Sequence, residues 1–250
     1  MKKVLVIGKY TLKENISNKV FNGILYFGIL AMFFTTMLDE VALYEGGRVI
    51  RDSGLFLTEL LVMLITVYIS STYVIKAVTE KSIYLVLTKA VTKSKYIMGI
   101  NLGIIYSVFV NVFLMGGILG FILYTKGEFD WWYIRALFFI GLKLSIVSSL
   151  GVFFSVISDS FVTSTIFTLF TYILGHGVLE IKAISEKLTG SIFQWILDFL
   201  YLILPKFNLL NYRDYLIDPN MNYFMILGYV GVYIICVVVA TILVFERKRL

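Results

Sequence analysis

Six long apolar stretches run through this chain of 250 residues, and charged residues interrupt them in only a few places. A helix needs roughly 18 or more apolar residues to cross the ~30 Å hydrocarbon layer of a membrane. Hydrocarbon cannot hydrogen-bond the backbone, so a spanning segment must be a helix or part of a closed barrel. The stretches are continuous rather than alternating, which favours helices. The sequence therefore predicts an all-α integral membrane protein with six transmembrane helices.

These spans leave little of the chain outside the membrane. A separate water-soluble domain needs at least ~50 residues, and no polar segment is that long. We therefore expect one transmembrane domain over residues 1–250, with an N-terminal helix that lies on the membrane surface. The predicted spans are residues 20–38, 54–75, 96–124, 131–157, 161–179 and 222–245.

Lysine and arginine are concentrated in three segments that an even number of spans places on one side of the membrane. These are residues 2–19, the stretch 76–95 between the second and third spans, and the tail 247–249. Segments rich in these residues stay in the cytoplasm. The sequence thus predicts a multi-pass protein of a cell membrane, inner or plasma, with both termini cytoplasmic. The net charge of +6 reflects this distribution and does not indicate nucleic-acid binding.

The residue types that carry most enzyme chemistry are scarce. Cys236 is the only cysteine and His176 the only histidine, which argues against a disulfide framework and against a thiol or imidazole metal site. The chain contains no phosphate-binding loop and no H-E-x-x-H, G-x-S-x-G or C-x-x-C motif. We therefore expect that this chain is not an enzyme and binds no cofactor or metal itself.

Two ionisable residues fall clearly inside predicted spans, Glu59 in the second and Lys143 near the middle of the fourth. A lysine at the bilayer centre costs ~2.5–3.5 kcal/mol on insertion scales, so it is usually paired or faces water. One interpretation is a polar patch in a substrate path, and the other is a snorkelling or structurally paired lysine. Glu59 is its candidate partner, and the pair could form across a dimer.

Small residues mark two further helix faces. In the third span, glycines stand four residues apart at 99–103 and 116–120, a spacing that permits close helix approach. The fifth span carries small and hydroxylated residues on one narrow face, which could line a transport cleft or form a helix–helix seam, including a dimer contact. These residues are Ser164, Thr168, Thr171 and Gly175. His176, next to this face, is expected to be an interfacial histidine rather than a proton relay.

The charged stretch between the second and third spans contains a short helical pattern. Thr79 is a candidate N-cap, and Glu80 falls in the first turn, where the helix dipole favours an acid. Ile83, Val86, Leu87 and Ala90 then form an apolar face, surrounded by Lys81, Lys89, Lys93 and Lys95. The sequence predicts a cytoplasmic amphipathic helix over residues 79–90, which could lie on the membrane or insert into a groove of a soluble partner.

Three segments, taken in order, resemble ABC-2 type transporter permeases. They are residues 48–54 before the second span, residues 80–99 through the predicted amphipathic helix, and residues 204–214 before the last span. With an N-terminal surface helix and six spans, the resemblance covers essentially the whole chain. The sequence departs from the family pattern at Ala90, where proline is usual, at Lys93 in place of arginine, and at Ile100 in place of lysine. These departures leave the details of docking open.

The resemblance implies that residues 79–90 form a coupling helix, seated in a cleft of a separate ABC-type ATP-binding subunit that binds ATP–Mg. It implies two permease chains, identical or different, in an exporter, and short re-entrant or interfacial helices before the last span. The implied coupling residues are Glu80, Ile83, Val86, Leu87, Lys89 and Lys93. The alternative is a non-transporting membrane scaffold or sensor that recruits a partner through residues 79–90. An ion-coupled secondary transporter fits less well, because no inverted repeat is evident and buried acids are few.

Overall fold

The structure, a computed structural model, describes residues 2–41, 46–83, 91–158, 160–188, 192–211 and 223–248. This part of the chain is built from helices and contains no strand. The long elements are α1 (Lys2–Ile16), α2 (Lys19–Val41), α3 (Gly46–Thr79), α5 (Lys93–Thr125), α6 (Trp132–Ile157), α7 (Phe161–His176), α8 (Val178–Lys187), α9 (Ile192–Ile203) and α10 (Tyr223–Arg247), with a short 3₁₀ helix η1 (Phe207–Leu210).

Five helical segments within the described residues are long and apolar enough to cross a membrane, which makes this a multi-pass membrane protein. Two further pairs, α1 with α2 and α7 with α8, pass the same test together but are bent by 61° and 66°. Counting each pair as one span gives up to seven. The five segments are residues 47–79, 93–125, 132–157, 192–210 and 223–247.

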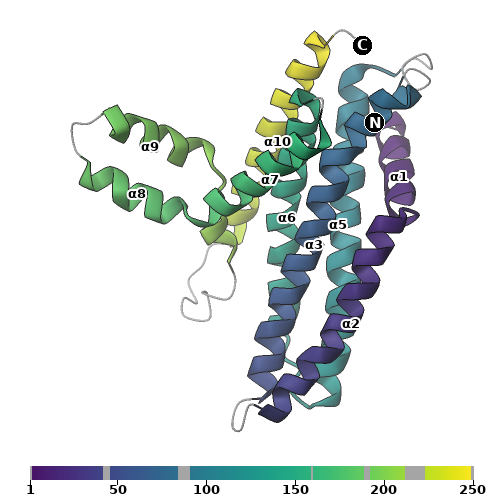
Figure 1. Cartoon of the computed structure of the whole chain (residues 1–250), viewed down its shortest axis with the longest axis vertical. Coiled ribbons are helices and arrows are strands. Elements are labelled where there is room, and N and C mark those ends of the chain that lie inside the picture. The colour runs from purple at the N-terminus through teal and green to yellow at the C-terminus, as the bar shows by residue number, and fades with distance from the viewer. Residues whose placement is uncertain are drawn as a thin grey trace.

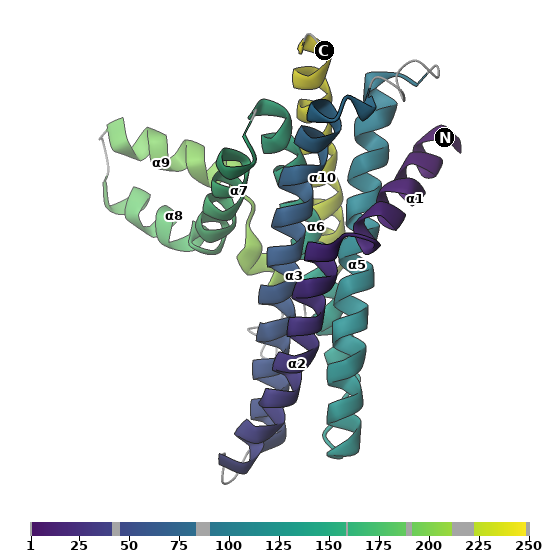
Figure 2. The same cartoon turned by 45° about the vertical axis from the view of Figure 1, so that its right-hand side comes forward.

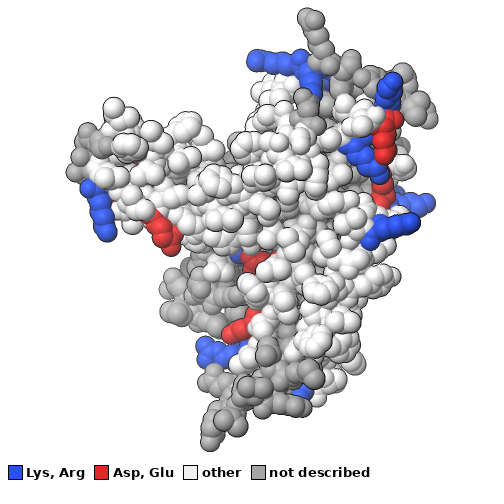
Figure 3. Space-filling model, in the orientation of Figure 1, with Lys and Arg blue, Asp and Glu red and all other residues white. Residues whose placement is uncertain are grey.

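The helices α3, α5 and α6 run along the length of a bundle, α2 lies along its lower part, and α10 lies beside its upper part (Figure 1). Helix α1 packs on the upper part of α5, and α8 and α9 form a hairpin that projects from the side of the bundle (Figures 1 and 2). Both chain ends lie at the same end of the bundle (Figure 1). The face seen in Figure 3 carries few charged residues along the middle of the bundle, as expected of a surface that meets lipid.

Helix α6 forms the centre of the bundle, in contact with α3, α5, α7 and α10. Every residue from 139 to 152 is buried. A helix that is apolar on all sides avoids water either inside the protein or in lipid, and α6 is enclosed by its neighbouring helices. Small residues let the neighbouring helices approach closely, since Gly141 faces the Phe109 ring and Gly151 faces Ser70 on α3. The two hydrophobic clusters of the protein meet along this helix.

Close backbone contact and buried hydrogen bonds fix α1 against α5. A Cβ at Gly103 would lie 2.6 Å from the carbonyl oxygen of Gly8, and one at Gly99 would lie 2.7 Å from Ile7. Asn15 Nδ2 donates to Ser107 Oγ at 3.0 Å, and both residues are buried. The predicted close approach at glycines 99 and 103 is therefore confirmed, and its partner is the N-terminal helix.

The predicted fifth span, residues 161–179, does not continue straight to its end. Helix α7 stops at His176, and the N–H of Gly177 bonds to the carbonyl oxygens of Ile173 and Leu174. The chain then turns by 66° into α8. An end closed by such backbone bonds is a usual way to stop a helix. The prediction of one straight helix across residue 177 is wrong, because α7 ends at His176 and α8 starts in a new direction at Val178.

The hairpin of α8 and α9 has polar residues between its helices and apolar residues outside. Asp198 Oδ1 accepts hydrogen bonds from Ser185 Oγ at 2.8 Å and from Lys182 Nζ at 3.4 Å. Large apolar side chains of α9 are 62–80% exposed, among them Ile192, Phe193, Trp195, Phe199 and Leu202. Water would favour the opposite arrangement. The pattern fits a hairpin whose outer surface meets lipid.

Substituting Gly103 by alanine should destabilise the protein. The added methyl would collide with the backbone of α1, and overpacking of this kind costs about 1–3 kcal/mol. Gly117, on the same helix, has no atom within 4 Å of a Cβ, so its alanine variant should be neutral or slightly stabilising. Thermal unfolding in detergent compares the two variants. Equal melting temperatures would contradict the close packing of α1 on α5.

Trp195 reports the environment of the hairpin. In a variant with Trp131 and Trp132 replaced by phenylalanine, Trp195 is the only tryptophan left, because the chain has three. Its indole is 79% exposed, so lipids brominated on their acyl chains should quench its fluorescence strongly, and aqueous iodide should not. The matched control keeps only Trp131. Strong quenching of Trp195 by iodide would exclude a lipid-facing hairpin.

Candidate functional site

A buried ion pair joins the two intramembrane charges. Lys143 Nζ on α6 lies 2.7 Å from Glu59 Oε1 on α3, and the two side chains are 1% and 12% exposed. Both residues belong to the same chain, so the pair does not need a dimer. The long contact between α3 and α6 brings them together. A buried charge without a partner is strongly unfavourable, and this contact compensates both.

Helix α7 adds two side chains to this pair from one helical turn. Tyr172 donates its hydroxyl proton to Glu59 Oε1 at 3.1 Å. His176 Nε2 lies 3.4 Å from Lys143 Nζ, and its Nδ1 lies 2.9 Å from the carbonyl oxygen of Tyr172. Phe207 of η1 packs against both rings, at centroid distances of 5.7 Å and 5.2 Å. We refer to Glu59, Lys143, Tyr172 and His176 as the polar cluster.

The contacts of His176 define its tautomer. An ammonium group can only donate hydrogen bonds, so Nε2 must accept from Lys143. A carbonyl oxygen can only accept, so Nδ1 carries the proton that is donated to Tyr172. His176 is therefore a neutral imidazole with its proton on Nδ1. The polar cluster then has no net charge, because the charges of Glu59 and Lys143 cancel.

The polar cluster lines a cavity of about 400 Å³. Ligand pockets in proteins typically measure ~300–1,000 Å³, with apolar walls and a few polar groups that orient the ligand. This cavity has that composition. Its walls are Phe56, Leu60, Met63 and Ile173, together with Glu59, Lys143, Tyr172, His176 and Asn211. Among the described residues, no group of three His, Cys, Asp or Glu side chains is placed to hold a metal ion.

The sequence identifies only part of this site. Glu59 and Lys143 stand out as charges inside apolar stretches, and the structure places them in contact. Tyr172 and Asn211 carry no such signal, since both residue types are common outside binding sites. His176 was expected to be an interfacial histidine, and the structure places its ring in contact with Lys143, a contact that the sequence does not indicate.

Most of the small-residue face of the fifth span is buried against protein. Ser164 and Thr168 are 0% and 1% exposed, and Thr171 is more open. The hydroxyls of Thr168 and Thr171 donate to carbonyl oxygens of their own helix, at 2.8 Å each. A Cβ at Gly175 would lie 2.6 Å from the Phe207 ring. Of the two alternatives, this placement favours a helix–helix seam within the chain.

A second candidate region lies where α3 ends, close to both termini. Thr79 is the last residue of α3, and its hydroxyl donates back to the Ile75 carbonyl oxygen at 2.9 Å. The prediction that Thr79 caps a new helix is therefore wrong. Glu80 also continues the α3 bonding pattern, and the break comes at Lys81, which has a left-handed φ of 57°. Helix α3 therefore continues about one turn past residue 75, where the second span was predicted to end.

The predicted coupling residues fall partly in the described chain. Glu80 is exposed, with its carboxylate 3.9 Å from Lys76 Nζ, and Ile83 is fully buried. Lys93 begins α5, and its Nζ donates to the carbonyl oxygen of Lys248 at 2.9 Å. Three of these predicted residues lie outside the described residues, namely Val86, Leu87 and Lys89.

The start of α5 is fastened to the end of α10. Ser94 Oγ donates to Glu246 Oε1 at 2.7 Å, and the rings of Tyr96 and Phe245 stack at 6.5 Å. Thr92 accepts a hydrogen bond from the N–H of Lys95 and so caps α5. The start of α5, which follows the predicted coupling segment, is thus fastened to the bundle.

Comparison with known proteins adds no relative. No protein-family model matches the chain, and no curated protein matches it significantly.

Removing one charge of the ion pair should destabilise the protein more than removing both charges. Lys143→Met leaves the Glu59 carboxylate buried without its ammonium partner, and breaking a buried pair costs about 3–5 kcal/mol. The double variant Glu59→Leu with Lys143→Met removes both charges and should melt at a higher temperature than Lys143→Met alone. Thermal unfolding in detergent gives the comparison. Additive losses would show that the two residues do not interact.

Proposed function

We propose that this chain is the permease subunit of an ATP-driven ABC transporter, most simply an exporter. Two observations support the proposal. Residues 48–54, 80–99 and 204–214 resemble ABC-2 type permeases in order along the chain. The segment from Glu80 to Thr92 joins two long helices at the end of the bundle that also holds both termini (Figure 1). This is the end that the distribution of Lys and Arg assigns to the cytoplasm.

In this proposal the segment 79–90 docks into a separate ABC-type subunit that binds and hydrolyses ATP–Mg. A second permease chain, identical or different, completes the translocation pathway. The complex lies in the inner or plasma membrane with both permease termini in the cytoplasm. Nucleotide-driven movement of the ATPase subunits would push on residues 79–90.

Helix α3 provides a direct connection from that segment to the cavity. It is unbroken from Gly46 to Thr79, and Glu59 lies 21 residues before Glu80. At 1.5 Å per residue, that separation is about 30 Å along the helix axis. A rigid helix moves as one body, so displacement at Glu80 would also displace Glu59. We propose that the cavity beside Glu59 and Lys143 forms part of the pathway that this movement opens and closes.

Charge reversal at Glu80 tests the coupling. Glu80→Lys and Leu87→Arg should lower substrate-stimulated ATP hydrolysis by at least tenfold, because each places an unsuitable side chain on the proposed docking helix. Glu128→Lys is the matched control, since it reverses an exposed acid in the loop at the opposite end of the bundle. The assay uses the complex of this chain with its copurified ATPase subunit, reconstituted in lipid nanodiscs. Full ATPase activity in both coupling variants would refute the assignment.

The same purification separates the permease from the scaffold alternative. The tagged chain is isolated from membranes of its own host, and the captured subunits are identified by mass spectrometry. A subunit with a phosphate-binding loop and the ABC signature supports the permease. A partner without a nucleotide-binding site, lost on Leu87→Arg, supports a scaffold or sensor.

A further inference from the structure

We propose that His176 is a proton-binding site that controls the bend between α7 and α8. The proposal rests on the contacts of one imidazole and does not depend on the function proposed above. His176 is the last residue of α7, and the chain turns by 66° at the next residue. Its ring touches three elements at once, so a change in its charge acts on the joint from which the α8–α9 hairpin projects (Figure 2).

Side chains from several elements surround the ring. Within the described part of the chain, the titratable side chains that face it are Lys143 from α6, Glu59 from α3 and Tyr172 from its own helix. On η1, the imidazole packs against the uncharged ring of Phe207. On α8, the Glu180 carboxylate lies 3.9 Å from the position of a Cβ at Gly177, the residue that follows His176.

A second proton on His176 would disturb this arrangement. It would bind Nε2, which now accepts from the Lys143 ammonium at 3.4 Å, and so would place two cations in contact. Glu59 Oε1 is 3.9 Å from Nε2, so attraction to it is weaker than repulsion from the nearer Nζ. That oxygen already accepts from Lys143 and Tyr172. The protonated imidazole must therefore move away or displace Lys143 from Glu59.

The imidazole has room to move because it is partly exposed. Its side chain is 34% exposed, whereas that of Lys143 is 1% exposed and is surrounded by the bundle. His176 is thus the member of the polar cluster that can leave. Its departure removes the contacts with Lys143 and Phe207 that join the end of α7 to α6 and η1. Acidification should therefore loosen the bend and change the position of the hairpin, and return to neutral pH should restore it.

The single histidine makes the proton directly observable. Protein labelled with ¹⁵N-histidine and produced without a histidine tag gives one imidazole in solid-state NMR spectra. In lipid bilayers near pH 8 we expect the neutral tautomer with its proton on Nδ1, and we expect double protonation on lowering the pH to about 5. A neutral tautomer with its proton on Nε2, or a ring that stays neutral at about pH 5, would overturn the proposal.

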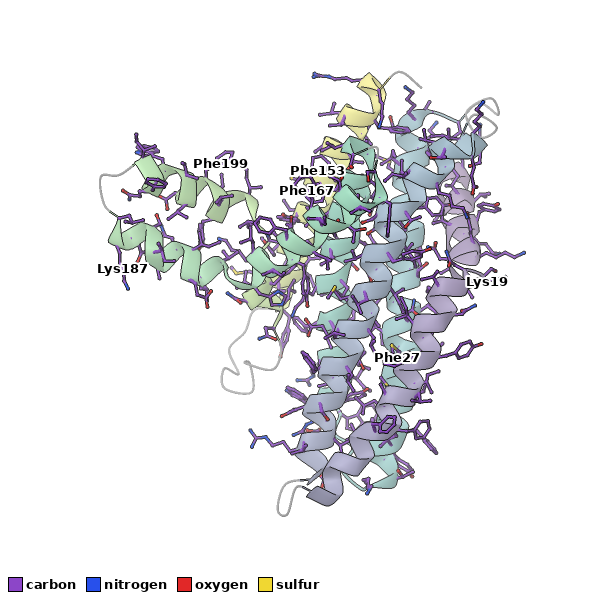
Figure 4. All side chains as sticks on the ribbon, viewed as in Figure 1. Lys19, Phe27, Phe153, Phe167, Lys187 and Phe199 are labelled. Carbon is purple, nitrogen blue, oxygen red and sulfur yellow. The ribbon has the colours of Figure 1, made fainter. Side chains whose placement is uncertain are left out.

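Movement of the hairpin is measured in the same protein. Spin labels are placed on Cys236, which is exposed on α10, and on Lys187→Cys at the end of α8 (Figure 4). The distance distribution in nanodiscs should shift or broaden reversibly between about pH 8 and about pH 5. His176→Gln should keep the high-pH distribution at both values. His176→Arg, whose guanidinium stays charged in proteins, should show the low-pH distribution at both.

Several outcomes of the distance measurement contradict the proposal. An unchanged distribution in the parent protein means that protonation does not reach the hairpin. The same pH response in His176→Gln means that another group titrates. Gel filtration of each variant identifies any that fail to fold. If both substituted proteins fail to fold, the NMR experiment on the unmodified histidine still decides the question.

Discussion

One ammonium group in the centre of the bundle constrains how the surrounding helices pack. Lys143 lies in a stretch of α6 in which every residue from 139 to 152 is buried. A charge in that position needs a partner or water, and here the counter-charge of Glu59 provides the partner. Glu59 must therefore face α6, which fixes the rotation of α3 about its axis. Because Tyr172 also bonds to Glu59, the same requirement sets the rotation of α7.

The features predicted correctly from the sequence are those that depend on neighbours along the chain. Apolar length alone predicts membrane-spanning helices, and glycine spacing predicts close contact at residues 99–103, which α1 provides. The bend at Gly177 and the break at Lys81 lie at the ends of long apolar helices, and the apolar pattern gives no warning of either. Hydrophobicity specifies that a helix forms more reliably than where it stops.

The only site residues that could be predicted from the sequence are the charged ones that interrupt an apolar stretch. Glu59 and Lys143 are charges in apolar stretches, and the cost of burying each alone implies a partner. Tyr172 and His176 join them because α7 packs on both α3 and α6, a tertiary contact that no local spacing encodes. For the same reason the small-residue face of α7 could not be assigned to a cleft or a seam without its neighbours.

Stability alone is a weak reason for such a cluster. Replacing a buried ion pair by well-packed apolar residues is often neutral or stabilising, so leucine and methionine could hold α3 against α6 equally well. What apolar residues lack is a second charge state. The polar cluster has no net charge as it stands, and it borders a cavity and a helix bend. A charge added there, by a ligand or a proton, would act at once on α3, α6 and α7, which all contribute side chains to the cluster.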